Sequence, residues 1–94
     1  MVLTIKFIGA LRHITGKTQL IIDIEKEMTL KELLAKIGQE TPALEKTFGE
    51  QQTGDYASNA LILVNGREIS VLNGLETKLA DGDEIVFVPV VHGG

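Results

Sequence analysis

The feature that most constrains this chain lies near its C-terminal end, where four consecutive residues, 85–88, are all apolar. They follow Glu84 and the turn-forming sequence Asp81-Gly82-Asp83, so residues 84–88 are predicted to form a strand. A strand that is apolar on both faces belongs in the middle of a sheet. The chain, which is 94 residues long, must therefore supply neighbouring strands for both of its edges within one small domain.

Two further strands are predicted in the N-terminal part of the chain. Leu3, Ile5 and Phe7 are separated by single residues, and the same spacing returns at residues 20–24. This period of two is typical of strands that place one face on a core. The two segments are predicted to pair as a hairpin, with residues 9–17 as the connecting loop.

The best-defined helix signal begins at Thr29. Thr29 is followed three residues later by Glu32, which is the pattern of a capping box. Apolar residues then recur at helical spacing, and Gly38 is the predicted stop; they are Leu30, Leu33, Leu34 and Ile37. A second short helical segment is predicted at 41–48, and a polar loop at 49–58.

The remaining strands give the fold class. Residues 61–64 are apolar and run into Asn65-Gly66, a strong signal for a two-residue hairpin turn, with the return strand predicted at 67–71. Strand, strand, helix and further strands in this order predict an α+β domain with one main helix packed on one face of a mixed sheet.

A single helix covers only one face of such a sheet. Ile8 follows Phe7, and Val86 and Val88 alternate with Ile85 and Phe87. Ile8, Val86 and Val88 are therefore predicted to lie on the opposite face, near solvent. Two readings of this face are open. Loops or the 41–48 segment could cover these residues, or they could form a docking patch for a partner protein.

Composition narrows the function classes. Nine basic and thirteen acidic residues give a net charge of −4, and no basic run is present, which argues against binding to nucleic acid or to an anionic membrane. Cysteine is absent and there are two histidines, His13 and His92, so no metal site and no catalytic group is predicted. We expect a cytoplasmic domain that binds no cofactor and does not catalyse alone.

The last six residues are predicted to form a flexible tail, 89–94, beyond a folded domain of residues 1–88; their sequence is Pro89, Val90, Val91, His92, Gly93 and Gly94. Proline cannot continue the hydrogen-bond ladder and favours an extended residue before it. Six extended residues reach about 20 Å, and glycine, which has no Cβ, passes a narrow channel. The terminal carboxylate could thus enter another protein's active site. The alternative, a frayed chain end, is left open.

These motifs together resemble a known family. Residues 81–87, followed by Pro89 and a terminal Gly93-Gly94, resemble the molybdopterin synthase small subunit and its relatives, the MoaD/ThiS-like sulfur carriers and archaeal small modifier proteins. The resemblance covers nearly the whole chain, since Leu11-Arg12, Gly16 and Val64-Asn65-Gly66 fit the same pattern in the same order. It implies the ubiquitin-like β-grasp fold.

The resemblance also implies that Gly94 is the reactive residue, with Gly93 beside it. In such carriers an activating enzyme uses ATP to join the terminal carboxylate to AMP, and sulfur then replaces AMP to leave a thiocarboxylate. In the synthase the tail enters the large subunit and donates that sulfur to a pterin precursor. Ile8, Val86, Val88 and residues 89–92 would contact these partners.

Two other functions stay open at this point. In archaeal relatives the same terminus can be joined to lysines of target proteins, which would make the chain a ubiquitin-like modifier. The third possibility is a β-grasp binding module whose terminus does nothing.

Overall fold

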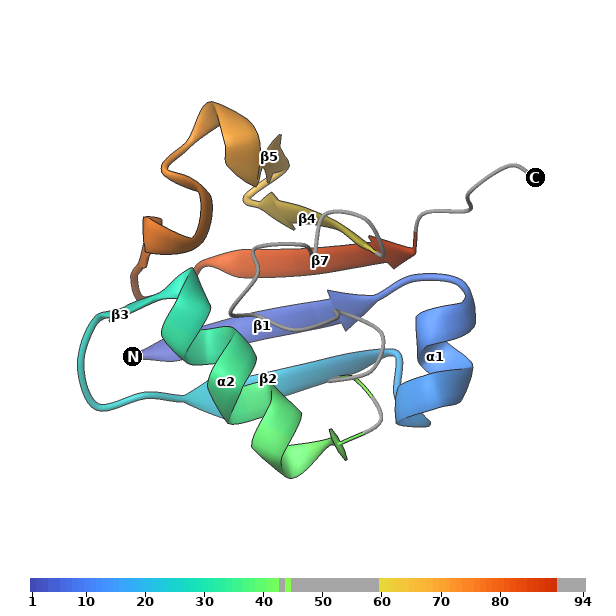
Figure 1. Cartoon of the computed structure of the whole chain (residues 1–94). Coiled ribbons are helices and arrows are strands. Elements are labelled where there is room, and N and C mark those ends of the chain that lie inside the picture. Colours follow the sequence, from blue (N-terminus) through green and yellow to red (C-terminus); the bar gives the residue numbers. More distant parts are fainter. Residues whose placement is uncertain (43, 45–59, 90–94) are drawn as a thin grey trace.

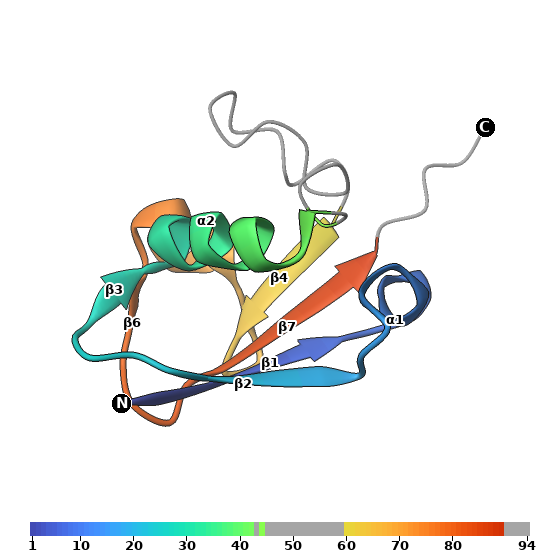
Figure 2. The same ribbon diagram turned by 90° about the horizontal axis from the view of Figure 1, so that it is seen from below.

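The computed structural model (Figure 1) describes residues 1–42, 44 and 60–89. In this part of the chain a mixed sheet forms one layer and the helix α2, Leu30–Glu40, forms the other. Figure 2 shows α2 lying across one side of the strands. The predicted α+β architecture, with one main helix on a mixed sheet, is confirmed.

The main sheet has five strands in the order β2-β1-β7-β4-β5. Their bounds are Val2–Phe7 for β1, Gln19–Asp23 for β2, Ala60–Val64 for β4, Arg67–Glu68 for β5 and Glu84–Pro89 for β7. Strand β7 lies in the centre, parallel to β1 and antiparallel to β4. The central position predicted for the segment apolar on both faces is confirmed, and the strand extends to Pro89, one residue beyond its predicted end.

The core lies between the sheet and α2. Alternate residues of β1 and β7 face it, and the rings of Phe7 and Phe87 stack there with their centroids 5.9 Å apart. Fully buried apolar residues of α2 cover them from above, because the helix turns its apolar stripe toward the strands; these are Leu30, Leu33, Leu34 and Ile37. The expected pairing of β1 with β2 as an antiparallel hairpin is also observed.

Helix α2 begins as predicted and ends later than predicted. The Thr29 hydroxyl accepts a hydrogen bond from the Glu32 amide over 3.2 Å, and the Glu32 carboxylate accepts one from the Thr29 amide over 3.1 Å. Gly38 is not the stop. It is buried within the helix, and the Thr41 amide still donates to the Ile37 carbonyl over 2.8 Å, so the helical pattern continues to the cap at Thr41.

The segment predicted as a loop at 9–17 contains a helix, α1, Ala10–Thr15. Leu11 is fully buried and anchors this helix to the core. Gly16 ends it in the left-handed conformation, φ 73°, with its amide donating to the Arg12 carbonyl over 2.8 Å. Six residues are too few for a clear apolar period, which is why the pattern did not predict this helix.

The predicted return strand at 67–71 is also shorter in the structure. After β5 the chain turns into a short 3-10 helix, η3, Ile69–Val71, because the Glu68 carboxylate accepts a hydrogen bond from the Ser70 amide and Ile69 turns inward to the core. A second, two-stranded sheet and one more 3-10 helix complete the described part; they are β3 (Met28–Thr29), β6 (Lys78–Leu79) and η4 (Gly74–Glu76).

Two predicted segments lie largely outside the described residues. Of the helical segment predicted at 41–48, only residues 41, 42 and 44 are described, and Leu44 is fully buried. The loop predicted at 49–58 lies wholly outside, so it stays a prediction.

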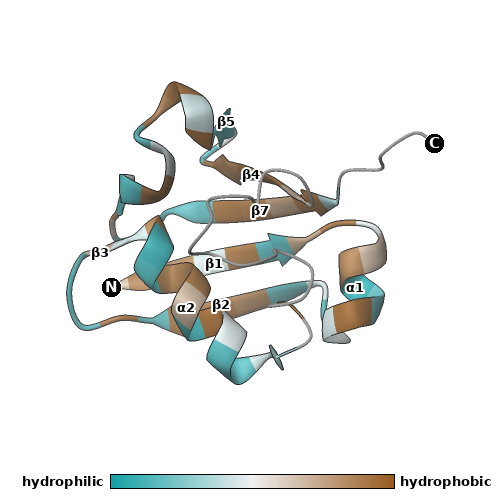
Figure 3. Cartoon of the chain, viewed as in Figure 1, coloured by the Kyte–Doolittle hydropathy of each residue, from teal (hydrophilic) through white to brown (hydrophobic). Residues whose placement is uncertain are grey.

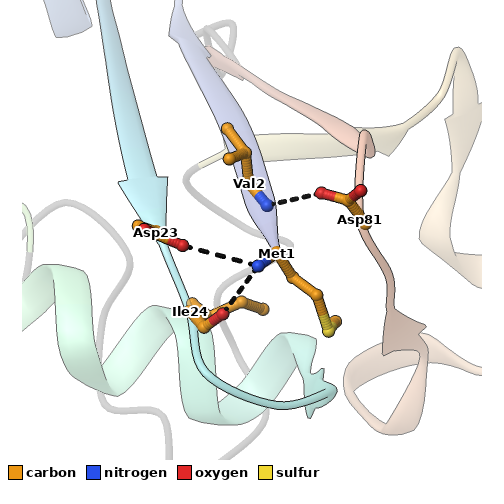
Figure 4. Close-up of polar contacts among 5 residues, drawn as sticks. All are labelled: Met1, Val2, Asp23, Ile24 and Asp81. Carbon is orange, nitrogen blue, oxygen red and sulfur yellow. Dashed lines mark hydrogen bonds and ion pairs between the residues drawn. The ribbon is translucent and has the colours of Figure 1, made fainter.

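Polar contacts attach the start of β1 to both neighbouring segments (Figure 4). The Val2 amide donates to Oδ1 of Asp81 over 2.6 Å, which joins β1 to the turn before β7. The Met1 amino group donates to the Ile24 carbonyl over 3.0 Å and forms a 3.4 Å ion pair with Asp23. These contacts fix the start of β1 against the end of β2 and against the turn that precedes β7.

The predicted turn at Asn65-Gly66 is confirmed and does more than reverse the chain. Both residues have positive φ, 51° for Asn65 and 84° for Gly66. The Asn65 side chain donates to Asp83 over 2.9 Å and accepts from the Glu84 amide over 2.9 Å. It therefore links the β4–β5 turn to the first residue of the central strand.

Replacing Asn65 with alanine tests this link. The Asn65→Ala variant loses both side-chain hydrogen bonds. It also places alanine, whose side chain cannot form a local hydrogen bond, in the left-handed region of φ and ψ. We expect the free energy of unfolding to fall by about 1–2 kcal/mol, measured by urea denaturation followed by circular dichroism. Asn73→Ala is the matched control, because Asn73 makes no side-chain cap bond to η4. Equal losses in the two variants would contradict the link.

Candidate functional site

The face of the sheet opposite α2 carries a group of apolar side chains that we call the outer patch. The patch consists of Ile8, Leu61, Leu63, Val86 and Val88. Ile8 and Leu61 are 37% and 38% exposed, and the other three are half-buried. Figure 2 shows no described helix on this side of the strands, and Figure 3 shows that β4 and β7 are hydrophobic over most of their length.

Strand register brings these residues together. Leu61 is paired with Val88 and Leu63 with Val86 across the antiparallel β4–β7 ladder. Ile8 follows the last residue of β1, and its amide donates to the Phe87 carbonyl over 3.1 Å, so it lies beside Val88. Cross-strand neighbours on one face are about 5 Å apart at Cβ. The outer patch is thus one continuous apolar surface.

The patch has a charged border. Lys6, which is in register with Val86 on the same face, forms a 3.0 Å ion pair with Glu84. Both side chains are 43% exposed, so the pair adds little to stability. The Lys6–Glu84 pair lies where an interface would have its polar rim. It limits how far an apolar partner surface can extend along the strands.

Sequence reasoning predicted three members of the patch and missed two. Ile8, Val86 and Val88 lie together on the face where alternation placed them. Leu61 and Leu63 were not assigned to it, although they alternate with residues that face the core. That alternation is the signal that could have identified them.

The patch adjoins the C-terminal end of β7. Pro89 is the last residue of β7 and is in register with Ala60 of β4. It follows Val88 of the patch directly. The other predicted tail residues lie outside the described part and stay predictions; they are Val90, Val91, His92, Gly93 and Gly94.

A candidate metal site and a membrane-spanning helix are both absent from the described residues. Across 1–42, 44 and 60–89, no three His, Asp or Glu side chains are grouped so that they could hold a metal ion. His13 lies exposed on α1, within the element that the sequence did not predict. In the same ranges no helix is long and apolar enough to cross a bilayer. At this face the described part presents apolar side chains bordered by the Lys6–Glu84 pair.

Comparison with known sequences identifies a family and relatives of this chain. The ThiS family model matches residues 5–94. A putative sulfur carrier protein of Archaeoglobus fulgidus is 41% identical over 74 residues, which are 78% of this chain and 81% of the relative. Small archaeal modifier protein 3 of Haloferax volcanii is 29% identical over 94 residues, the full length of both chains.

Solved structures agree with this. The small archaeal modifier protein 1 of Methanosarcina acetivorans superposes with a TM-score of 0.79 at 32% identity, covering 99% of this chain and 96% of that one. A chain in the complex of subunits 1 and 2 of the molybdopterin-converting factor of Helicobacter pylori gives 0.61 at 26%, covering all of both chains. The fold is thus the predicted β-grasp. Because the family model covers nearly the whole chain, the protein belongs to the ThiS family.

Proposed function

We propose that this protein is a sulfur carrier for molybdopterin biosynthesis. Its Gly94 carboxylate is adenylated by a partner activating enzyme, converted to a thiocarboxylate and then presented to the large subunit of a synthase. The folded part recognises these partners and supplies no catalytic group. In this role the protein is not an enzyme on its own but the small subunit of a sulfur-transferring one.

The observation that carries the proposal is the position of the outer patch beside Pro89. Val88 belongs to the patch, and the chain continues from Pro89 toward the terminal glycines. An enzyme that binds the patch therefore holds the start of the tail at the border of the contact. Exposed apolar side chains that are grouped on one face of a domain favour such a binding site.

The chemistry explains why a partner and ATP are needed. A free carboxylate is a poor electrophile. When a carboxylate oxygen of Gly94 attacks the α-phosphate of ATP, pyrophosphate leaves and an acyl adenylate forms. A sulfide-level sulfur nucleophile then attacks the carbonyl carbon and displaces AMP. The product is a thiocarboxylate, and neither step requires an acid or base from this chain.

The relatives support the carrier chemistry and a partner subunit. One relative is named a sulfur carrier, and one structural neighbour is a subunit of the molybdopterin-converting factor in complex with its second subunit. We take the second subunit as the model for the partner of this chain. The sulfur acceptor would be the pterin precursor that such a synthase binds.

Protein modification is the second candidate. Two relatives that match nearly all of this chain are named small archaeal modifier proteins. The same acyl adenylate serves this function if a lysine amine of another protein displaces AMP and forms an isopeptide bond. The two functions share the first step and differ only in the nucleophile.

Mass spectrometry distinguishes these outcomes. We expect the untagged protein, incubated with its activating enzyme, ATP and sulfide, to gain the mass difference between sulfur and oxygen on Gly94. Isopeptide adducts on other proteins would instead favour the modifier. If neither product forms with an enzyme that activates a known substrate, the protein is a plain binding module and the proposal is wrong.

Removal of Gly94 provides the control for that experiment. The deletion variant should form no thiocarboxylate, because the carboxylate then lies on Gly93 and ends one residue short. Its melting temperature should stay within about 2 °C of the parent, since a chain end beyond the last strand contributes little burial. Sulfur on the shortened chain would contradict the assignment of Gly94.

A charge in the outer patch should separate binding from folding. For Val88→Asp we expect the Kd for the activating enzyme to rise about tenfold or more, because docking would bury an unpaired carboxylate. Val71→Asp is the control, since Val71 is 73% exposed on η3, away from the patch. Titration calorimetry measures the affinities, and circular dichroism checks the fold. Unchanged affinity for Val88→Asp would contradict the docking role.

A further inference from the structure

Strand β2 forms one edge of the main sheet and is open along one side. It pairs with β1 in unbroken register from Gln19 to Asp23, and no described strand lies beyond it. Figure 2 shows α2 over one face of the sheet and not in its plane, so the helix does not occupy this edge. Within the described part of the chain, the β2 backbone therefore has a strand partner on one side only.

The hydrogen bonds to β1 show which residues of β2 face the open edge. The Thr18 carbonyl accepts from the Phe7 amide over 3.0 Å, and the Ile24 amide donates to the Met1 carbonyl over 2.7 Å. In an antiparallel ladder, residues that bond to the neighbouring strand alternate with residues whose N–H and C=O groups point away from it. The residues between Thr18 and Ile24 whose backbone groups point away are Gln19, Ile21 and Asp23.

This edge has none of the devices that usually protect an edge strand. Such strands are very short, carry lysine or proline, or contain a bulge. The strand at the opposite edge, β5, has two residues, whereas β2 has five. No lysine or proline occurs in β2, and its register with β1 contains no bulge. Ile21, at its centre, is 62% exposed. The outward N–H and C=O groups match those of another extended strand.

A second copy of β2 is complementary to this edge. When two β2 strands run antiparallel with Ile21 opposite Ile21, Gln19 lies opposite Asp23 of the other copy, so an amide donor meets a carboxylate. In the same register Leu20 lies opposite Ile22, and apolar side chains meet. Each of the three outward pairs exchanges two N–H···O bonds. A register centred on Asp23 would instead place two carboxylates opposite each other, which is unfavourable.

We propose that this protein forms a two-fold symmetric dimer in which the β2 edges of two copies pair antiparallel about Ile21. The two sheets then become one continuous sheet. No residue of the outer patch lies on β2, so the patch stays exposed in both copies and partner docking is compatible with the dimer. The inference does not depend on the proposed function. Because the contact is confined to one edge strand of each copy, we expect a weak dimer with a Kd of about 0.1–1 mM.

Sedimentation equilibrium and hydrogen exchange test the dimer and its location. Between about 10 μM and 2 mM, the weight-average mass should rise from that of the monomer toward that of the dimer. Exchange of the Gln19, Ile21 and Asp23 amides, followed by NMR, should slow over the same range. The Leu20 and Ile22 amides bond to β1 and should exchange slowly at every concentration. A monomer throughout would overturn the inference, as would a dimer that leaves the three outward amides unprotected.

A charge at the centre of β2 should break the dimer. For Ile21→Lys we expect the dimer Kd to rise about tenfold or more, because two ammonium groups would lie opposite each other. Val71→Lys is the matched control: it changes the net charge equally, and Val71 is 73% exposed on η3, which follows β5 at the far edge of the sheet. Circular dichroism checks both folds. Equal Kd values for the two variants would count against the dimer.

Substitutions at Gln19 test the register and cover the case in which Ile21→Lys does not fold. Gln19→Lys places an ammonium group opposite Asp23 of the other copy at both ends of the interface, and should lower the dimer Kd about threefold or more. Gln19→Glu places a carboxylate there and should raise it by a similar factor. Val71→Lys and Val71→Glu are the controls for net charge. If the Gln19 variants follow these controls, or show the reverse order, the inference is wrong.

Discussion

The parallel pairing of β1 with β7 is the interaction on which the rest of this structure depends. It joins the first and last strands of the described residues, with Phe7 beside Phe87 in register and their rings stacked in the core. A parallel pair needs a long crossover connection, and here that connection supplies α2 and the remaining strands. In the sheet, β2 flanks this pair on one side and β4 on the other.

The same pairing explains why the central strand is apolar on both faces. Ile85 and Phe87 face α2 and are completely buried, so they serve the core. Val86 and Val88 face the other way and stay partly exposed beside Leu61 and Leu63. Val86 and Val88 are the residues to which the proposed docking role assigns a function, in addition to their pairing across the β4–β7 ladder.

Several features were predictable because neighbouring residues produce them. The capping box at Thr29 and the turn at Asn65-Gly66 depend on hydrogen bonds and φ angles within a few residues, so the local pattern is sufficient. Alternation placed Val86 and Val88 on the outer face for the same reason. The helix α1 was missed because its order depends on Leu11 entering a core built by distant strands, which no window of six residues records.

By itself the sequence determined the capped helix, the tight turn and the period of the strands, since each is a property of adjacent residues. Only the tertiary structure decided that Leu61 and Leu63 join Val88 in one patch. These contacts join residues from different segments of the chain. They exist because strand order brings those segments together; the periodicity of one segment indicates which face its residues take, but not which strand lies beside it.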